Sequence, residues 1–527
     1  MVEFDPVLVH GWLERAAARR PGKKALVCGS RALTYHEVDE LSTRLAWTLN
    51  GSGYRPGDRA VVLLENSLEA VVSIYGILKA GGVFIVADPD APAVALARLL
   101  HDCGAGTIIA HDDNKNLVRS ACREIRNCAI IWVGRSGYPD KSTTTENPWE
   151  NAVSSAAPPR ALPHVLDVDL AALIYTSGST GRSKGIMCSH HNMVSAARSI
   201  IQYLGNSSDD IILDALPLSF DYGLYQVLMS VMFEGTIVLE KSAGYIAPLI
   251  DRIEQEKVTG LPLVPSLSAM FLRLKRFPKE KLASLRYITN TGALWPESHI
   301  RMFREKLPHV KIFSMYGLTE CKRVAFLPPE LIDSRPDSVG KPMPNCEADV
   351  VDGIGSPVRP GETGELVVRG SNVMQGYWND PELTRLFFRN GRWPADRRLY
   401  TGDLFRLDGD GFLYFAGRKD DLVKCSGRRV SLREVEDALT SVAGVEEACV
   451  VAVPDDLAGN VMAAFVSADK SRQADAADLR TRLEQMLEPY KIPRYIWFLN
   501  SLPRTPNGKV DRKKLQDEAQ ELARQGG

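Results

Sequence analysis

The sequence lacks the residue patterns that mark disulfide-bonded and metal-binding proteins. Its nine cysteines include no C-x-x-C pair, and its nine histidines form no H-E-x-x-H or comparable metal pattern. An odd and scattered set of cysteines is typical of reduced thiols, so we expect a cytoplasmic protein. The adjacent residues His190 and His191 are interpreted as surface or cap residues.

The sequence also lacks an excess of charge and long apolar runs. Its 64 Lys and Arg residues nearly balance its 65 Asp and Glu residues. Such a balance gives no bulk field that favours nucleic acid or an anionic membrane. No apolar run approaches membrane-spanning length, and the first residues lack the basic and apolar regions of a signal peptide. We therefore expect neither a nucleic-acid partner nor a membrane span in these 527 residues.

Helical and strand periods alternate through the first 400 residues. Expected helices cover 7–19, 35–49, 68–80, 191–204, 224–233, 245–256 and 266–274, and expected strands cover 25–28, 33–34, 59–64, 83–86, 107–110, 129–133, 170–174, 211–216, 236–239, 260–264 and 285–289. Strand, helix and strand at this spacing predict parallel βαβ units. Residues 134–166, rich in Ser, Thr, Pro, Asn and Gly, are predicted to be a surface excursion.

The composition changes near residue 340, where short strands are separated by Gly, Pro and Asp. This change predicts a small β-rich subdomain, and the later helices and strands predict a further α+β core of ordinary size. The expected fold is α/β, with a large N-terminal domain at 1–417 that includes the β-rich subdomain. A hinge at 418–421 and a smaller, mobile α+β C-terminal lid domain at 422–527 complete this prediction.

The most informative stretch is Y-T-S-G-S-T-G-R-S-K-G at 175–185. Its glycines allow positive φ and bring several N–H groups to one anion, while Lys184 adds a full positive charge. A Walker A loop would need Gly at position 183 and Ser or Thr at position 185, where this chain has Ser183 and Gly185. The stretch therefore predicts a phosphate-binding loop of another kind.

Four further motifs follow in order. Glu320 ends M-Y-G-L-T-E and is either a solvated carboxylate or, beside phosphates, an Mg²⁺ ligand. Asp403 ends Y-T-G-D, where an aspartate after glycine is commonly a turn residue. The cation-rich stretch 417–431 could be a solvated face. Lys509 follows the tight turn Asn-Gly in P-R-T-P-N-G-K-V-D-R, where a lone lysine is most often simply exposed.

Together the five motifs resemble those of the AMP-forming acyl-adenylating superfamily, which includes acyl-CoA synthetases, luciferases and peptide-synthetase adenylation domains. The run Gly376-Tyr377-Trp378 fits as well, so the resemblance covers almost the full length. It implies ATP and Mg²⁺, with Glu320 as the metal ligand. The nucleotide-binding residues that it implies are Thr176, Ser177, Gly178, Ser179, Thr180, Gly181, Lys184, Tyr316, Thr319, Asp403, Arg418 and Lys509.

The resemblance also implies roles for these residues. Lys184 would hold the β- and γ-phosphates, Thr319 would contact the α-phosphate and Tyr316 would stack on the base. Asp403 and Arg418 would bind the ribose, because a carboxylate can accept both hydroxyls at once. Lys509 would bridge the acid and the α-phosphate, so Lys184, Thr319 and Lys509 are the expected catalytic residues. Because Lys509 belongs to the small domain, that domain should swing in for adenylation and rotate away for thioester formation. The resemblance places Asp420 at the hinge and Gly427 at the thiol tunnel.

The acid pocket is expected to be lined by Asp221, Tyr222, Tyr225, Ile288, Asn290, Met315, Arg323 and Val324. Asp221 falls where amino-acid-activating members place the carboxylate that binds the α-ammonium group. Arg323 would suit a second carboxylate or a hydroxyl group. Alternatively, Asp221 and Arg323 could pair with each other and leave an apolar pocket. The class of acid stays open at this point.

The resemblance implies a ligase that activates a carboxylic acid as an acyl-adenylate, releases pyrophosphate and transfers the acyl group to a thiol. Coenzyme A is favoured as the thiol. The alternative is a free-standing enzyme that loads an amino or related acid onto the phosphopantetheine of a discrete carrier protein. No carrier attachment serine is found in the sequence, so we expect the acceptor to come in trans. A non-catalytic nucleotide sensor and a luciferase-type oxygenase are the other rivals.

Overall fold

The computed structural model describes residues 5–525 except 124, 126–127, 135–144, 155–160, 177–183, 242–244, 293–294, 394–395, 420–421, 426–427, 456–458, 469–474, 488–490 and 506–507. The backbone divides into two compact units. The first unit comprises Met1–Ala348 with Val368–Leu399, and the second comprises Asp349–Val367 with Tyr400–Gly527.

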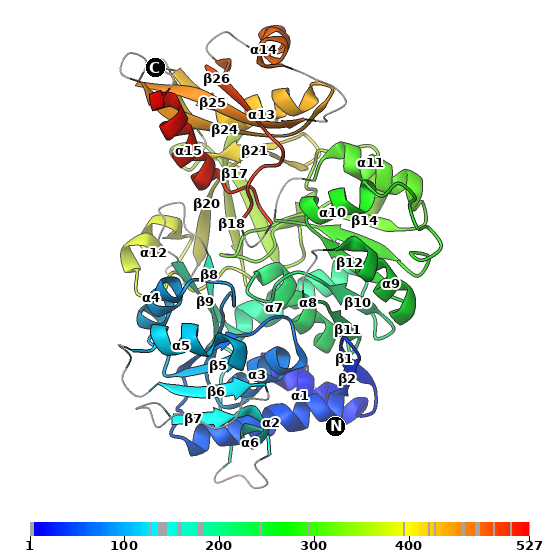
Figure 1. Cartoon of the computed structure of the whole chain (residues 1–527), viewed down its shortest axis with the longest axis vertical. Coiled ribbons are helices and arrows are strands. Elements are labelled where there is room, and N and C mark those ends of the chain that lie inside the picture. The colour runs from blue at the N-terminus through cyan, green and yellow to red at the C-terminus, as the bar shows by residue number, and fades with distance from the viewer. Residues whose placement is uncertain are drawn as a thin grey trace. The chain divides into compact units, whose positions relative to one another are not determined.

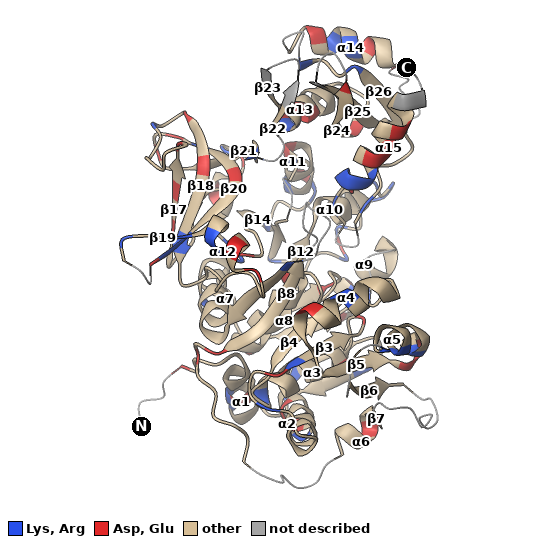
Figure 2. Ribbon diagram, turned by 90° about the vertical axis from the view of Figure 1, so that its left-hand side faces the viewer, with Lys and Arg blue, Asp and Glu red and all other residues tan. Residues whose placement is uncertain are grey.

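A seven-stranded sheet in the first unit has the order β7-β6-β5-β3-β4-β8-β9. All neighbours from β7 to β8 are parallel, and β9 turns back antiparallel to β8. The central strands β4, β5 and β6 carry no charged residue other than the histidine that ends β5, as expected of strands covered on both faces (Figure 2). The strands are β3 (Arg59–Leu63), β4 (Val83–Val86), β5 (Thr107–His111), β6 (Ala129–Val133), β7 (Thr145–Pro148), β8 (Leu170–Thr176) and β9 (Lys184–Ser189).

A nine-stranded sheet in the same unit has the order β16-β15-β14-β13-β12-β10-β11-β1-β2 (Figure 1). Its central strands from β14 to β1 are parallel, and antiparallel strands flank them at both edges. The strands are β1 (Lys24–Cys28), β2 (Arg31–Thr34), β10 (Ile211–Asp214), β11 (Thr236–Leu239), β12 (Gly260–Leu263), β13 (Tyr287–Asn290), β14 (Lys311–Tyr316), β15 (Ala325–Phe326) and β16 (Lys341–Pro342).

Helices α3 (Leu68–Lys79) and α8 (Asp221–Met232) connect the two sheets. Every residue of α8 is buried, and so is every residue of α3 except the half-buried Glu69, which explains why neither helix has a broad polar face. Helix α3 contacts β3 and β4 of one sheet and β1 of the other, while α8 contacts β10 and β11. Helices α1 (Val9–Arg19), α2 (Tyr35–Gly51) and α7 (His190–Leu204) pack against them. This interior holds the start of α8 in place.

The first unit has further helices outside this interior. They are α4 (Ala93–Cys103), α5 (Lys115–Ala121), α6 (Trp149–Ala152), α9 (Ile246–Glu256), α10 (Pro265–Leu272), α11 (Glu297–Lys306) and α12 (Pro381–Phe387). The expectation that 134–166 is an irregular excursion was wrong for part of its length. There β7 pairs with β6 and is followed by α6, because Trp132 and Glu146 join the two strands by a 3.0 Å hydrogen bond.

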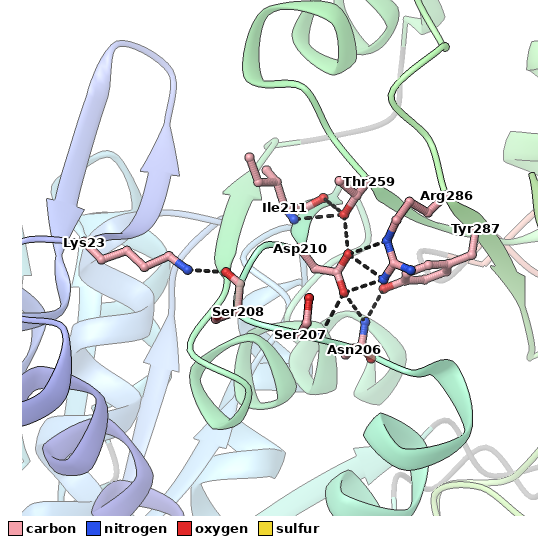
Figure 3. Close-up of polar contacts among 9 residues, drawn as sticks. All are labelled: Lys23, Asn206, Ser207, Ser208, Asp210, Ile211, Thr259, Arg286 and Tyr287. Atoms are coloured by element: carbon pink, nitrogen blue, oxygen red, sulfur yellow. Dashed lines mark hydrogen bonds and ion pairs between the residues drawn. The ribbon is translucent and has the colours of Figure 1, made fainter.

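Asp210 organises the amino-terminal edge of the nine-stranded sheet (Figure 3). Its Oδ1 accepts hydrogen bonds from Nε of Arg286 at 2.9 Å and from the hydroxyl of Thr259 at 2.7 Å. Burial acts to raise the pKa of Asp210, but the bonds from Arg286 and its neighbours leave that pKa below its usual value. Nearby, Lys23 donates to the carbonyl of Ser208 (Figure 3). Because these residues precede strands β10, β12 and β13, the network fixes the edge opposite to the strands' carboxyl ends.

The second unit includes most of a five-stranded sheet and a separate α+β core. The five-stranded sheet has the order β17-β18-β20-β19 with β21 on β20, and a three-stranded sheet has the order β24-β25-β26. The elements are β17 (Cys346–Val351), β18 (Thr363–Gly370), β19 (Phe388–Asn390), β20 (Arg397–Leu407), β21 (Leu413–Arg418), β22 (Leu422–Cys425), β23 (Arg428–Ser431), α13 (Leu432–Ser441), β24 (Val445–Asp455), β25 (Gly459–Ala468), α14 (Ala476–Glu484), β26 (Tyr495–Leu499) and α15 (Arg512–Gln525).

The α/β fold with a β-rich part and a C-terminal α+β part is therefore confirmed. The proposed hinge includes Asp420, which lies outside the described residues, so the boundary at 418–421 and the mobility of the lid stay predictions. Among the residues that the structure describes, every helix is too short or too polar to span a bilayer.

Candidate active site

The lysine of the predicted phosphate loop lies in an antiparallel hairpin. Strands β8 and β9 pair so that Thr176 faces Lys184 and Tyr175 faces Gly185. A side chain at Gly185 would bring its Cβ within 2.9 Å of the Tyr175 ring, so glycine lets this hairpin close. The two ends of the loop are thus held side by side. Ser177, Gly178, Ser179, Thr180 and Gly181, which were expected to bind phosphate, lie outside the described residues.

Tyr377 brings this lysine and the expected metal ligand together. Nζ of Lys184 lies 5.7 Å from the ring centroid of Tyr377 and 5.6 Å from that of Phe387. Both distances are within the range of cation–π attraction. The hydroxyl of Tyr377 donates to Oε1 of Glu320 at 2.8 Å. The ring therefore contacts the predicted phosphate-binding cation, while its hydroxyl holds the predicted metal carboxylate.

The segment that carries this tyrosine extends the hairpin. Met187 accepts a hydrogen bond from the N–H of Gln375 at 2.8 Å and donates to the carbonyl of Gly376 at 2.9 Å. Met374 donates to the backbone carbonyl of Glu320 at 2.9 Å. Backbone pairing therefore fixes both the hairpin and the glutamate to one extended segment.

Two buried asparagines anchor the same segment. Asn372 donates from Nδ2 to the carbonyls of Cys321 and Arg323, both at 2.8 Å. Asn192, in the first turn of α7, donates to the two carbonyls that flank Asn372, both at 2.9 Å. An asparagine amide has two N–H donors, so each side chain can hold two carbonyls at once. These bonds fix the turn that follows Glu320.

That turn follows β14 and depends on a close backbone approach. A Cβ on Gly317 would lie 2.2 Å from the carbonyl oxygen of Lys322, which only glycine tolerates. Lys322 itself has a φ of +62°, in the left-handed region that side chains rarely adopt. The N–H of Val324 closes the turn by donating to Tyr316 at 2.9 Å. The half-buried Thr319 lies within it.

Lys322, not Arg323, pairs with Asp221. Asp221 is the first residue of α8 and is 8% exposed, while Lys322 is 3% exposed. Nζ of Lys322 lies 2.7 Å from the backbone carbonyl of Asp221 and 3.3 Å from its Oδ2. The alternative that Asp221 and Arg323 pair with each other is therefore wrong. Burial lowers the pKa of Lys322 to about 7, with the neighbouring Asp221 acting in the opposite direction.

Arg323 is buried without a carboxylate. It is 2% exposed, and its guanidinium carbon lies 5.3 Å from the ring centroid of Tyr222. Its Nε has no hydrogen-bond partner among the described residues, and no ion pair joins it to a described carboxylate. The hydroxyl of Tyr203 is a hydrogen-bond partner of the guanidinium, but a neutral hydroxyl does not balance its charge. A buried charge without an ion-pair partner is costly, so this guanidinium requires an explanation.

Two further buried polar atoms near this guanidinium also lack described partners. They are the hydroxyl of Tyr225 and Oδ2 of Asp214, which ends β10. Nζ of Lys322 lies 4.3 Å from the ring centroid of Tyr225. Burial raises the pKa of Asp214 well above its usual value. The fully buried Tyr222 differs, because its hydroxyl is satisfied by Thr289 at 2.7 Å.

Cys188 in β9 lies between this cluster and the expected metal ligand. Burial raises the pKa of its thiol, and the carboxylates of Asp221 and Glu320 add to that effect. Both carboxylates are therefore close to one side chain of β9. Of the other residues expected to line the acid pocket, Ile288 and Asn290 lie in β13, Met315 lies in β14 and Val324 follows Arg323, and all are buried.

The second unit holds the residues expected to bind ribose. Asp403 in β20 faces Arg418 in β21, and Oδ1 of Asp403 lies 3.2 Å from Nε of Arg418. Lys509 is exposed at the end of a turn that is closed by a 2.8 Å bond from the N–H of Thr505 to its carbonyl. Gly427, like the hinge aspartate, lies outside the described residues.

Sequence reasoning missed Lys322 and Tyr377 as site residues and misplaced His190. The signal for Tyr377 was its Gly-Tyr-Trp run, and for Lys322 it was a lysine directly after a motif. Neither signal reveals a partner, because Lys322 and Asp221 are 101 positions apart. His190 is 1% exposed, since its Nδ1 accepts the N–H of Val9 at 3.1 Å, so it is not a surface residue.

The fold and the site define an α/β protein with a hairpin lysine, a nearby carboxylate and a buried polar cluster. The family model of AMP-binding enzymes matches residues 13–378, and that of the AMP-binding enzyme C-terminal domain matches residues 434–509. The chain belongs to the AMP-binding enzyme family.

Several known proteins are similar to the chain. It is 31% identical over 511 residues to bacitracin synthase 3 of Bacillus licheniformis, a match that covers 97% of the chain but only 8% of that protein. Its fold matches o-succinylbenzoate CoA synthetase of Bacillus subtilis in complex with its acyl-adenylate intermediate, with a TM-score of 0.82, 28% identity and coverage of 96% and 98%. ATP-bound MatB of Rhodopseudomonas palustris matches with a TM-score of 0.86, 26% identity and coverage of 97% and 99%.

Proposed function

We propose that the protein is an AMP-forming acid–thiol ligase. In the first step a carboxylate oxygen of the acid attacks the α-phosphorus of ATP, and the bond to pyrophosphate breaks. In the second step a thiolate sulfur attacks the acyl carbon, and the bond to AMP breaks, while the thiol proton passes to solvent. Coenzyme A is the proposed thiol.

This proposal rests on the position of Tyr377, whose ring lies near Lys184 and whose hydroxyl donates to Glu320. Acid and ATP are both anions, so the reaction requires charge neutralisation and in-line positioning. Lys184, fixed at the loop end of the β8–β9 hairpin, would neutralise the β- and γ-phosphates. Thr319 would donate to the α-phosphate from the same turn that carries Glu320.

Glu320 fits a magnesium ion. Mg²⁺ prefers oxygen ligands and keeps several waters, so one carboxylate together with substrate phosphates suffices. Oε1 of Glu320 accepts the bond from Tyr377, and Oε2 is the oxygen we assign to the metal. When bound, the ion would neutralise charge on the leaving pyrophosphate. A hydroxyl bond to a metal-binding carboxylate is a common way to orient it.

The remaining nucleotide contacts are proposed for the second unit, except that of Tyr316, which ends β14 in the first unit. Asp403 would accept both ribose hydroxyls, with Arg418 beside it in the paired strands β20 and β21. Tyr316 would stack on the base. Lys509 would bridge the acid and the α-phosphate during adenylation and leave for thioester formation, with the hinge at Asp420 and the thiol tunnel at Gly427. A cytoplasmic location stays a prediction.

A second candidate is favoured by the similarity to bacitracin synthase 3. In that case the acceptor would be the phosphopantetheine of a discrete carrier protein and the acid would be an amino or related acid. The two candidates share the first step and differ only in the thiol.

The test is ATP–pyrophosphate exchange over fatty, aryl, amino and dicarboxylic acids, followed by mass spectrometry of the thioester. We expect exchange with one class of acid, AMP as product and a thioester of coenzyme A. A thioester formed only on a loaded carrier protein would favour the second candidate. No exchange and no AMP with any acid would contradict both, and oxygen uptake would point to the oxygenase.

A further inference from the structure

The polar cluster at the start of α8 comprises Asp214, Asp221, Lys322, Arg323 and Tyr225. It is buried, since each of these side chains belongs to a residue that is at most 8% exposed. Its members come from the carboxyl end of β10, the first turns of α8 and the turn after β14. The carboxyl edge of parallel strands is where α/β proteins bind ligands. The cluster therefore lies at the edge of the sheet where ligands of such proteins bind.

The negative charge of Asp221 is already compensated within the chain. The ammonium group of Lys322 lies within hydrogen-bond distance of the carbonyl and the carboxylate of Asp221. It also lies over the ring of Tyr225, at 4.3 Å from the centroid. A substrate ammonium group beside Asp221 would meet a cation of the same sign, and like charges at close range repel strongly where water is excluded. This arrangement therefore disfavours an acid that carries an ammonium group.

The positive charge of Arg323 is not compensated in the same way. Its guanidinium lies over the ring of Tyr222 and is hydrogen-bonded to the neutral Tyr203, while Nε has no described partner and no described carboxylate pairs with the charge. A guanidinium presents several N–H donors in one plane, which matches the two oxygens of a carboxylate. The side-chain amide of Asn372 donates to the backbone carbonyls of Cys321 and Arg323. These bonds fix the backbone from which the Arg323 side chain extends.

We propose that the acid activated by this protein carries no ammonium group and does carry, besides its reacting carboxyl group, a second oxygen-bearing acceptor group that Arg323 binds. A second carboxylate is the group that best matches the unpaired guanidinium, and a carbonyl oxygen is the weaker form of the same chemistry. This inference rests on the proposed function, because it names the acid for the adenylation step.

The test uses ATP–pyrophosphate exchange with acids matched in chain length. Each set contains an unsubstituted acid, its dicarboxylic or oxo counterpart and its 2-amino counterpart. We expect the wild type to prefer the acceptor-bearing acid. Arg323→Met should lower kcat/KM for that acid by about 100-fold and for the unsubstituted acid by about threefold or less, because only the former loses a charged hydrogen bond. An equal loss for both acids would overturn the inference.

Lys322→Ala tests the other half of the proposal. It removes the internal ammonium group and leaves Asp221 to attract an external one. The 2-amino acid should then gain about tenfold in kcat/KM relative to its unsubstituted counterpart, because one charge–charge repulsion is replaced by attraction. No gain, or a wild type that already prefers the 2-amino acid, would overturn the inference. Because the unpaired carboxylate could unfold the chain, Asp221→Asn/Lys322→Met is made as well, and it should keep the Arg323-dependent preference.

A matched control is available in α3. Lys79 is also buried, and its Nζ lies 2.6 Å from Oδ1 of Asp39. Lys79→Met should change stability but leave the ranking of the acids unchanged, and a changed ranking would show that the cluster does not set it. If the wild type shows no exchange with any acid, the proposed function fails and this inference fails with it. If exchange is found only with unsubstituted acids, the function holds and the inference alone fails.

Discussion

Removal of one hydroxyl group tests the arrangement of Lys184, Tyr377 and Glu320. Tyr377→Phe deletes the 2.8 Å bond to Oε1 of Glu320 and keeps the ring that faces Lys184. The ring is 3% exposed and packs edge to face against Phe388, with centroids 5.7 Å apart, so the fold should survive. A hydrogen bond to a charged group contributes about 1.5 to 3 kcal/mol, which corresponds to roughly 10- to 150-fold in an equilibrium constant.

We therefore expect the Mg²⁺ concentration that half-saturates ATP–pyrophosphate exchange to rise by about 10- to 100-fold in this variant, as found for partners of metal ligands. The rate at saturating Mg²⁺ should change much less. The control is Tyr175→Phe, which removes a 2.5 Å bond to Asp102 in the same hairpin without touching Glu320. A lower rate with an unchanged Mg²⁺ dependence would refute the assignment of Glu320, and so would an equal shift in the control.

Three other outcomes follow from the described contacts and the proposed roles. Lys509→Ala should abolish adenylate formation yet spare thioester formation from supplied acyl-adenylate, and equal loss in both assays would refute the domain swing. Arg286→Met should lower the free energy of unfolding by about 2 kcal/mol, because it strips the buried Asp210 of its cation, and an unchanged urea midpoint would contradict this. Burial lowers the pKa of His10 to about 3 and that of His190 to about 4, so only the unfolded chain takes up these protons below about pH 6.5. Stability should fall between pH 6.5 and 4 by up to about 1.4 kcal/mol per pH unit per histidine, and His10→Asn should flatten that slope.

The sequence placed most elements because their periods are local. The start of α8 shows where this reasoning stops. An apolar run predicts a helix from Leu224, but the helix begins at Asp221, since a buried polar residue at a helix start looks like a loop residue in the sequence. His190, which was expected to be a surface or cap residue, begins α7 but is buried. Its partner is the N–H of Val9, 181 positions away, and neither segment contains a sequence pattern that predicts this contact.

The candidate site divides in the same manner. Lys184 and Glu320 were identified from their motifs, and Asp221 was identified from the family resemblance. Which charge compensates which was not, and the plausible pair of Asp221 with Arg323 gave way to a pair with the adjacent Lys322. Lys322 lies in the left-handed region, with a φ of +62°, in a turn where a Cβ on Gly317 would come within 2.2 Å of its carbonyl oxygen, and motif spacing predicts neither feature.

What the sequence by itself determined is most of the strands and helices of the first 400 residues and the family, because periodicity and motif spacing are properties of neighbouring residues. Only the tertiary structure decided that Tyr377 contacts both Lys184 and Glu320 and that Lys322 pairs with Asp221. The physical reason is that charge compensation acts over a few ångströms in space, and the register of strands and turns brings together residues that lie far apart in the chain.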